Sequence, residues 1–278
     1  MASLTQKQME SAANKFVDDS QPARTVASSI TSSDADRSEK CREAQNALRS
    51  AVQSADSALL TGAVINRLNK VSQGKRVTGV WATEAQDSLR ASVLFGGAGL
   101  DRALKGLVED TIPELMTFDP AVSKKLRDHS ANSITVGQSV DPNQLIDLLL
   151  HEGTSPRDVL MKGWISSLTS SSAQSAERVE ELASALGVTD ATLRQRIAPA
   201  KKGGRKTPLQ LAFAARNQIA HELDITQPEA EIRRPLEQIR RRRAGAEMTD
   251  HVIEMLDVAQ LIINDVATRL SKHTGAVT

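Results

Sequence analysis

Apolar residues recur at helical spacing in several long segments of the chain, and no segment shows the strict alternation typical of β-strands. The first such segment starts at Ser33 or Asp34, either of which can cap a helix, and continues to Val71. Its apolar positions form a narrow, alanine-rich stripe, which predicts that this helix packs against another helix. The stripe consists of Leu48, Val52, Ala55 and Leu59.

The segment that begins near Thr83 has the strongest helical pattern in the chain. Gly96, Gly97 and Gly99 interrupt this pattern, and each glycine inside a helix costs roughly 1 kcal/mol relative to alanine. Three of them in a good helical pattern predict the close approach of another backbone. Pro113 is expected to limit the continuation of the helix. The apolar side consists of Leu89, Val93, Leu100, Leu104 and Leu107.

The remaining pattern predicts shorter helices followed by a long one. A proline at the first helical position, in Thr207-Pro208, opens one of them. The fold class is therefore all-α, a helical bundle of residues 79–278 preceded by a Ser/Ala-rich segment, residues 1–78, that carries one long helix. The other helices are expected at Asn143 to His151, Pro156 to Leu168, Ala176 to Leu186 and Thr249 to Leu270.

Composition limits how this chain can hold a nucleic acid. The 278 residues suffice for a sizeable core, but only 2% are aromatic and none is tyrosine, so recognition by stacking bases on rings is restricted. The net charge of +1 conceals a basic region between residues 194 and 243, which can attract phosphates locally. The candidate RNA-binding residues are Lys201, Lys202, Arg205, Lys206, Arg240, Arg241, Arg242 and Arg243; the alternative is that they are solvated loops.

Targeting, disulfide and metal signals are missing from the sequence. Cys41 is the only cysteine, which precludes an intrachain disulfide. The N-terminus lacks the apolar stretch of a secretory signal, and no apolar run approaches the roughly 20 residues that span a bilayer. The five histidines are scattered without metal-ligand spacing, and no phosphate-loop or dinucleotide fingerprint occurs. We expect a cytoplasmic protein with no membrane association, no metal and no cofactor.

The candidate chemistry lies in Arg216-Asn217-Gln218-Ile219-Ala220-His221, within a predicted helix. Arg216 and His221 are five residues apart, so a regular helix places them about 140° from each other. They therefore flank a groove unless the helix is distorted between them. The long arginine could fold back toward the histidine, or a second copy of the same helix could complete the groove. The side of the helix expected to be buried consists of Ala212, Ala215, Ile219 and Leu223.

This pair of residue types suits the cleavage of RNA. Histidine titrates near neutrality and can take the proton from a ribose 2′-OH or donate one to the leaving oxygen. Arginine supplies fixed positive charge for the phosphorane, and the 2′-OH is itself the nucleophile, so no metal is required. A symmetric dimer would supply a second histidine for the other proton transfer. The spacing alone arises easily by chance, and the alternative is a solvated helix face.

The pattern Arg-Asn-x-x-x-His inside an apolar helix resembles the signature of the HEPN superfamily, an all-α group that contains many metal-independent ribonucleases. The segment from Leu89 to Lys105 is similar to the first core helix of the RiboL-PSP type of HEPN domain. The order of helices is also similar. The resemblance covers roughly Trp81 to Lys272 and leaves the N-terminal third outside.

The resemblance implies that Arg216 and His221 are catalytic and that Asn217 is the polar residue often found directly after the arginine. It also implies a homodimer in which two motifs form one composite site. Similar proteins act as toxins or antiphage-defence effectors that cut tRNA or other cellular RNA, so an antitoxin or sensor protein is an expected partner. Arg90 and Asp101 either shape the site or have a structural role.

Two alternatives remain open on the sequence. The segment from Val179 to Arg196 resembles a helix-turn-helix, with Gly187 in the turn, which would make the protein a DNA-binding regulator. The other alternative is an inactive HEPN scaffold in which the helix from Asp34 to Val71 binds a partner protein or stabilises a homodimer. In the regulator, the residues facing DNA would be Thr192, Arg194 and Arg196.

Overall fold

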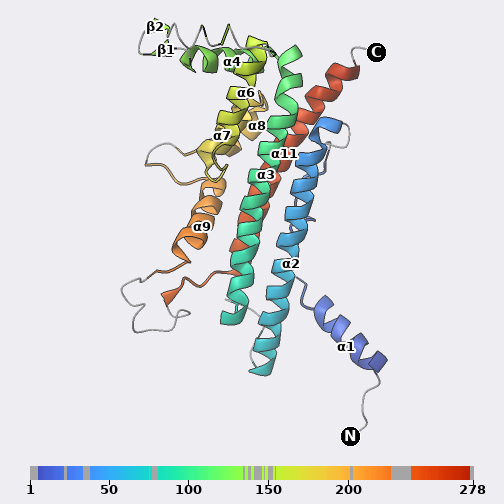
Figure 1. Ribbon diagram of the computed structural model, residues 1–278. Helices are drawn as coiled ribbons and strands as arrows, with labels where there is room; N and C mark the ends of the chain where they lie inside the picture. Colours follow the sequence, from blue (N-terminus) through green and yellow to red (C-terminus); the bar gives the residue numbers. More distant parts are fainter. Residues whose placement is uncertain are drawn as a thin grey trace. The chain divides into compact units, whose positions relative to one another are not determined.

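The computed structural model describes residues 6–21, 24–33, 38–74, 76, 81–133, 135–136, 139–140, 146, 148–149, 153, 155–200, 203–226 and 239–275. These residues form nine α-helices, two short 3-10 helices and one hairpin of two-residue strands, which confirms the predicted all-α class (Figure 1). The helices are α1 (Gln6–Asp18), α2 (Arg42–Ser72), α3 (Gln86–Phe118), α4 (Pro120–Ser133), α6 (Pro156–Thr169), α7 (Ala176–Ala185), α8 (Ala191–Ile197), α9 (Pro208–Glu222) and α11 (Gly245–Gly275). The 3-10 helices are η2 (Glu39–Cys41) and η3 (Thr83–Ala85), and the antiparallel strands are β1 (Thr135–Val136) and β2 (Ser139–Val140), with Thr135 opposite Val140.

Capping residues account for several of the helix starts that the sequence predicts. The Ser155 hydroxyl accepts a hydrogen bond from the Asp158 amide at the start of α6, and Ser175 does the same for Arg178 at the start of α7. Helix α9 begins at Pro208, as predicted. The helix expected at Asn143 to His151 falls largely outside the described residues. Helices α1 and α4 were not predicted.

Pro113 does not end its helix, contrary to the expectation from sequence. Helix α3 continues through it to Phe118. Pro113 lies on an exposed position, so water can satisfy the carbonyl of the preceding turn that the proline leaves without an amide. The neighbouring residues Ile112, Leu115 and Met116 are buried, and their packing outweighs the local cost of the proline.

The described fold consists of two compact units, each assembled from three stretches of sequence. The first comprises residues 1–30, 49–99 and 208–257, and the second comprises residues 31–48, 100–207 and 258–278. Helices α2, α3 and α11 each contribute residues to both units. The division does not follow the expected boundary after residue 78, because residues 49–74 of α2 belong to the same unit as residues 81–99.

Small residues bring the helices of the first unit close together. A Cβ atom on Gly99 of α3 would lie 2.0 Å from the Ala51 Cβ of α2, so only glycine fits there. The neighbouring Gly96 faces Met255 and Val252 of α11, with the Met255 Cε 3.0 Å from the position of a Cβ. The predicted close approach at these glycines is confirmed. The Trp81 ring lies against Gly62 of α2 and Gly245 of α11 in the same unit.

The second unit is held together by apolar packing and by hydrogen bonds from arginine side chains, among them Arg269. Its core contains Trp164 of α6, Leu182 of α7 and Ile262 of α11, all buried. Arg269 of α11 donates to the Asp119 carboxylate at 2.6 Å and to the Leu186 carbonyl at 2.7 Å. It therefore joins α11 to the start of α4 and to the turn after α7.

Cys41 is a buried free thiol of the second unit. Burial raises its pKa to about 11, so the thiol stays protonated at neutral pH. This cysteine is therefore a core residue and not a nucleophile.

Among the helices that the structure describes, none has the length and apolar character needed to cross a membrane.

Candidate functional site

Helix α9 positions the Arg-Asn-x-x-x-His motif by burying its opposite side in the first unit. Ala212, Ala215 and Ile219 are buried as predicted, together with Leu209 and Phe213. Leu223, which was expected to join them, is 56% exposed because the helix ends at Glu222 and the backbone turns left-handed, with φ 50° at Leu223. The buried side fixes the rotation of α9, and the motif residues are left on its accessible part.

Arg216 and His221 meet at the surface although they are five positions apart on α9. The Arg216 Nη1 lies 3.4 Å from the His221 Nε2 and donates to the Asn217 Oδ1 at 3.1 Å. His221 is exposed, whereas Arg216 and Asn217 are half-buried. The arginine therefore folds back along the helix toward the histidine, which is one of the two arrangements that the spacing permits. The three candidate catalytic residues form one accessible cluster.

The stem of Arg216 lies against α3. Gly97 is buried, and a Cβ atom placed on it would come within 3.2 Å of the Arg216 Cγ and 3.6 Å of its Nε. The arginine stem therefore packs against the backbone of α3 at Gly97, where there is no side chain. Gly97 was singled out in the sequence as a point of close approach, but its neighbour was not identified.

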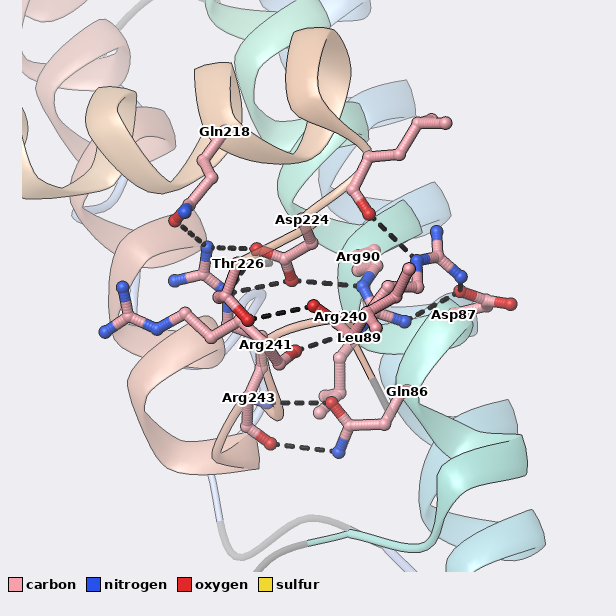
Figure 2. Close-up of polar contacts among 12 residues, drawn as sticks. Gln86, Asp87, Leu89, Arg90, Gln218, Asp224, Thr226, Arg240, Arg241 and Arg243 are labelled. Carbon is pink, nitrogen blue, oxygen red and sulfur yellow. Dashed lines mark hydrogen bonds and ion pairs between the residues drawn. The ribbon is translucent and has the colours of Figure 1, made fainter. Parts of the chain in front are cut away.

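A buried ion cluster fixes the backbone directly after the motif (Figure 2). Asp224 is fully buried, and Arg243 and Arg90 approach its carboxylate from opposite sides. The Arg243 Nη2 donates to the Asp224 Oδ1 at 2.6 Å, and the Arg90 Nε donates to the Asp224 Oδ2 at 3.1 Å. The side chains of the two arginines are only 2% and 8% exposed. Three charges therefore lie out of water beside the end of α9.

Hydrogen bonds extend this cluster to three segments of the first unit. Arg243 donates through Nη2 to the Gln218 Oε1 of α9 at 2.8 Å. Arg90 donates to the Arg241 carbonyl at 2.9 Å, and Gln86 bonds both the amide and the carbonyl of Arg243. The start of α3, the end of α9 and the segment before α11 are thereby tied together (Figure 2). A structural role for Arg90 agrees with one of the two roles expected from sequence.

The four arginines before α11 have different surroundings, and this corrects one candidate. Arg243 belongs to the buried cluster, so it is not placed to bind RNA as predicted. Arg240 pairs with Asp87 at 3.0 Å and donates to the Leu223 carbonyl at 2.8 Å, with 18% of its side chain exposed. Arg241 and Arg242 are exposed. Of the predicted phosphate-binding run, these two present their side chains most freely to solvent.

The basic loop before α9 is described only in part. Arg205 and Lys206 are exposed, whereas Lys201 and Lys202 lie outside the described residues. Arg205 and Lys206 precede Pro208, and His221 lies thirteen residues further on, which is about 20 Å along a helix. The two basic residues therefore lie near the opposite end of α9 from the motif.

Asp101, the other residue considered for shaping the site, has its partners in the second unit. Its carboxylate accepts a hydrogen bond from the Ala173 amide at 2.6 Å and pairs with Lys105 at 3.3 Å. Both contacts are structural.

The helix-turn-helix alternative corresponds to α7 and α8 in the second unit. Gly187 lies in the turn with φ 73°, as that alternative requires, and Ala183 and Leu193 are buried. However, Thr192 and Arg196 line a pocket of about 550 Å³ together with Asp265 and other residues of α11. The exposed Arg194 lines a second pocket, of about 410 Å³, that also includes Glu180 and Glu181. The acidic residues around Arg194 oppose the approach of a DNA phosphate to that residue, whereas the pocket of Thr192 and Arg196 also contains Arg269 and Lys272.

Sequence reasoning did not identify Asp224, Gln218 and Gln86. They belong to no helical stripe, and their roles depend on partners distant in the chain. The available signal was the acid that follows Leu223 in a region rich in arginine.

Within the described residues, no group of three or more His, Cys, Asp and Glu is arranged to hold a metal ion.

Comparison of the chain with protein-family models, with curated proteins and with solved structures found no match in any of the three.

Proposed function

We propose that this protein is a metal-independent endoribonuclease of HEPN type that cleaves cellular RNA, with Arg216, Asn217 and His221 as its catalytic set. The observation that supports this proposal is the distance of 3.4 Å between the Arg216 guanidinium and the His221 imidazole at an accessible position. A cation and a base next to each other are two of the groups that ribose-phosphate cleavage uses. The Asn217 amide oxygen accepts from Arg216 and holds the guanidinium in this place.

The proposed reaction uses the substrate's own hydroxyl. One histidine removes the proton of the ribose 2′-OH, and the 2′-oxygen attacks the adjacent phosphorus. The bond between phosphorus and the 5′-oxygen breaks, and an acid protonates that oxygen. The products are a 2′,3′-cyclic phosphate and a 5′-hydroxyl. Arg216 stabilises the additional negative charge of the phosphorane.

A second copy of the chain would complete this chemistry. His221 of one protomer can act as the base, and the His221 of the other protomer can protonate the leaving oxygen, in a composite site of a homodimer. The enzyme is proposed to act in the cytoplasm on tRNA or another RNA, as a toxin or antiphage-defence effector with an antitoxin or sensor as its partner. The proposed phosphate contacts are Lys201, Lys202, Arg205, Lys206, Arg240, Arg241 and Arg242.

The proposal is tested by incubating the purified protein with total RNA in the presence of EDTA. Wild type is expected to cleave it and to leave 2′,3′-cyclic phosphate ends. His221→Ala and Arg216→Ala are expected to lose cleavage by at least about 100-fold, because each removes one of these catalytic groups. His129→Ala is the matched histidine control, since His129 lies beside Trp164 in the second unit. Equal cleavage by wild type and His221→Ala would overturn the proposal.

Reversing the charges of Arg241 and Arg242 is expected to weaken RNA binding and to make its salt dependence shallower. Each phosphate contact contributes roughly 0.7 to the slope of log K against log salt concentration for a single strand. The slope of the double variant is therefore expected to be smaller by about 1.4. The matched control reverses Arg42 and Arg102, whose side chains are 67% and 65% exposed in the second unit. Measurement of binding at several salt concentrations gives both slopes, and an unchanged slope would remove Arg241 and Arg242 from the binding surface.

A further inference from the structure

The contact between Arg216 and His221 runs against the geometry of a regular helix. Residues five apart point about 140° away from each other, yet the Arg216 Nη1 lies 3.4 Å from the His221 Nε2. The arginine side chain has to bend back around α9 to close this gap. Something on the neighbouring surface must leave room for its stem along that path.

Gly97 of α3 provides this room. The Arg216 stem lies where a side chain at position 97 would begin, since a Cβ there would meet the arginine Cγ at 3.2 Å, Nε at 3.6 Å and Cδ at 3.8 Å. A separation of 3.2 Å between carbon atoms is shorter than the optimal 3.5 to 4.0 Å. An added Cβ therefore requires the stem to shift from its present path by a few tenths of an ångström. The other two glycines of this segment, Gly96 and Gly99, face α11 and α2 instead.

We propose that Gly97 is a positioning residue that acts through Arg216, by holding the guanidinium next to His221. The proposal rests on the proposed function for its catalytic readout, and on the contact geometry for its structural readout. It predicts a loss of turnover and little change in the binding of RNA, because the displaced group stabilises the transition state rather than the bound substrate.

The test compares Gly97→Ala with Gly106→Ala, a matched substitution in the same helix. A Cβ on Gly106 meets nothing within 4 Å, and both changes favour the helix equally. The substrate is a fluorescently labelled RNA oligonucleotide of mixed sequence. Gly97→Ala is expected to lower kcat about 10-fold and to leave KM within about 2-fold of wild type. The loss in kcat follows because a misplacement of 1 Å can cost about 100-fold in rate. Gly106→Ala is expected to retain the wild-type kcat. Gly97→Val, a larger side chain, should lower kcat further.

Two additional measurements separate this inference from the proposed function. In an Arg216→Ala background, Gly97→Ala is expected to have no further effect, and an equal loss there would overturn the inference because Gly97 would then not act through the arginine. In NMR spectra, the Arg216 Nε–Hε and His221 ring signals are expected to shift in Gly97→Ala and to stay in place in Gly106→Ala. If wild type fails to cleave any RNA, the proposed function is wrong and these spectra decide the inference. Unshifted signals in Gly97→Ala would overturn it.

Discussion

Asp224→Asn is expected to lower the free energy of unfolding by about 3 kcal/mol, because it leaves the buried Arg243 guanidinium without its counter-ion and removes one of the two carboxylates that pair with Arg90, which keeps Asp87. Arg243 and Arg90 both donate to this carboxylate and are almost completely out of water. Asparagine has nearly the same shape and can still accept one hydrogen bond, so the substitution removes the charge and creates no cavity. Chemical denaturation with urea measures the difference.

Asparagine also suits the backbone at this position. Asp224 has φ 62°, a left-handed conformation that asparagine and aspartate tolerate better than most residues. The expected loss is therefore electrostatic and not conformational. The matched control is Asp250→Asn, which breaks the ion pair between Asp250 and Arg24. The Arg24 side chain is 56% exposed and the Asp250 side chain 63% exposed, so this pair is expected to contribute less than about 1 kcal/mol. Equal losses in the two variants would show that the Asp224 cluster does not stabilise the fold.

Gly99→Ala is expected to lower the free energy of unfolding by about 2 to 3 kcal/mol, although alanine is the better helix former. The added Cβ would lie 2.0 Å from the Ala51 Cβ and 3.3 Å from the Leu256 Cδ2, so helix α2 has to move away from α3. The loss of close packing outweighs the gain in helix propensity, which is at most about 1 kcal/mol. Thermal and urea unfolding both measure the effect.

A compensating substitution makes this prediction specific to one contact. Ala51→Gly removes the atom that an alanine at position 99 would meet. The double variant Ala51→Gly with Gly99→Ala is therefore expected to have a free energy of unfolding within about 1 kcal/mol of that of wild type. The coupling between the two positions follows from a double-mutant cycle. Additive losses would mean that the methyl groups do not meet and that the helices do not approach in this way.

The sequence predicted the parts of the fold that depend on periodicity along a helix. Of the predicted stripe, Leu48, Ala55 and Leu59 are buried and Val52 is half-buried. The last predicted helix, Thr249 to Leu270, lies within α11. Helices α1 and α4 were missed because their sequences are mostly polar. Pro113 was given too much weight, since a proline on an exposed position leaves the buried side of α3 intact.

The candidate site was predictable only where its residues lie close in the chain. The motif marks Arg216, Asn217 and His221 because all three are within six positions of one helix. The buried role of Arg243 could not be foreseen, because a run of four arginines carries no periodic signal and Asp224 is nineteen residues earlier. Gly97 was recognised as a close approach, but the identity of its neighbour depends on how α3 and α9 pack.

The distribution of tryptophan between the two units gives each of them its own optical reporter. Trp81 lies against Gly62 and Gly245 in the first unit, and Trp164 is buried in the second. The chain contains no other tryptophan and no tyrosine. The emission of a Trp164→Phe variant therefore follows the surroundings of residue 81 alone, and that of Trp81→Phe follows residue 164 alone, so the melting of each half can be recorded in the intact chain without an added label.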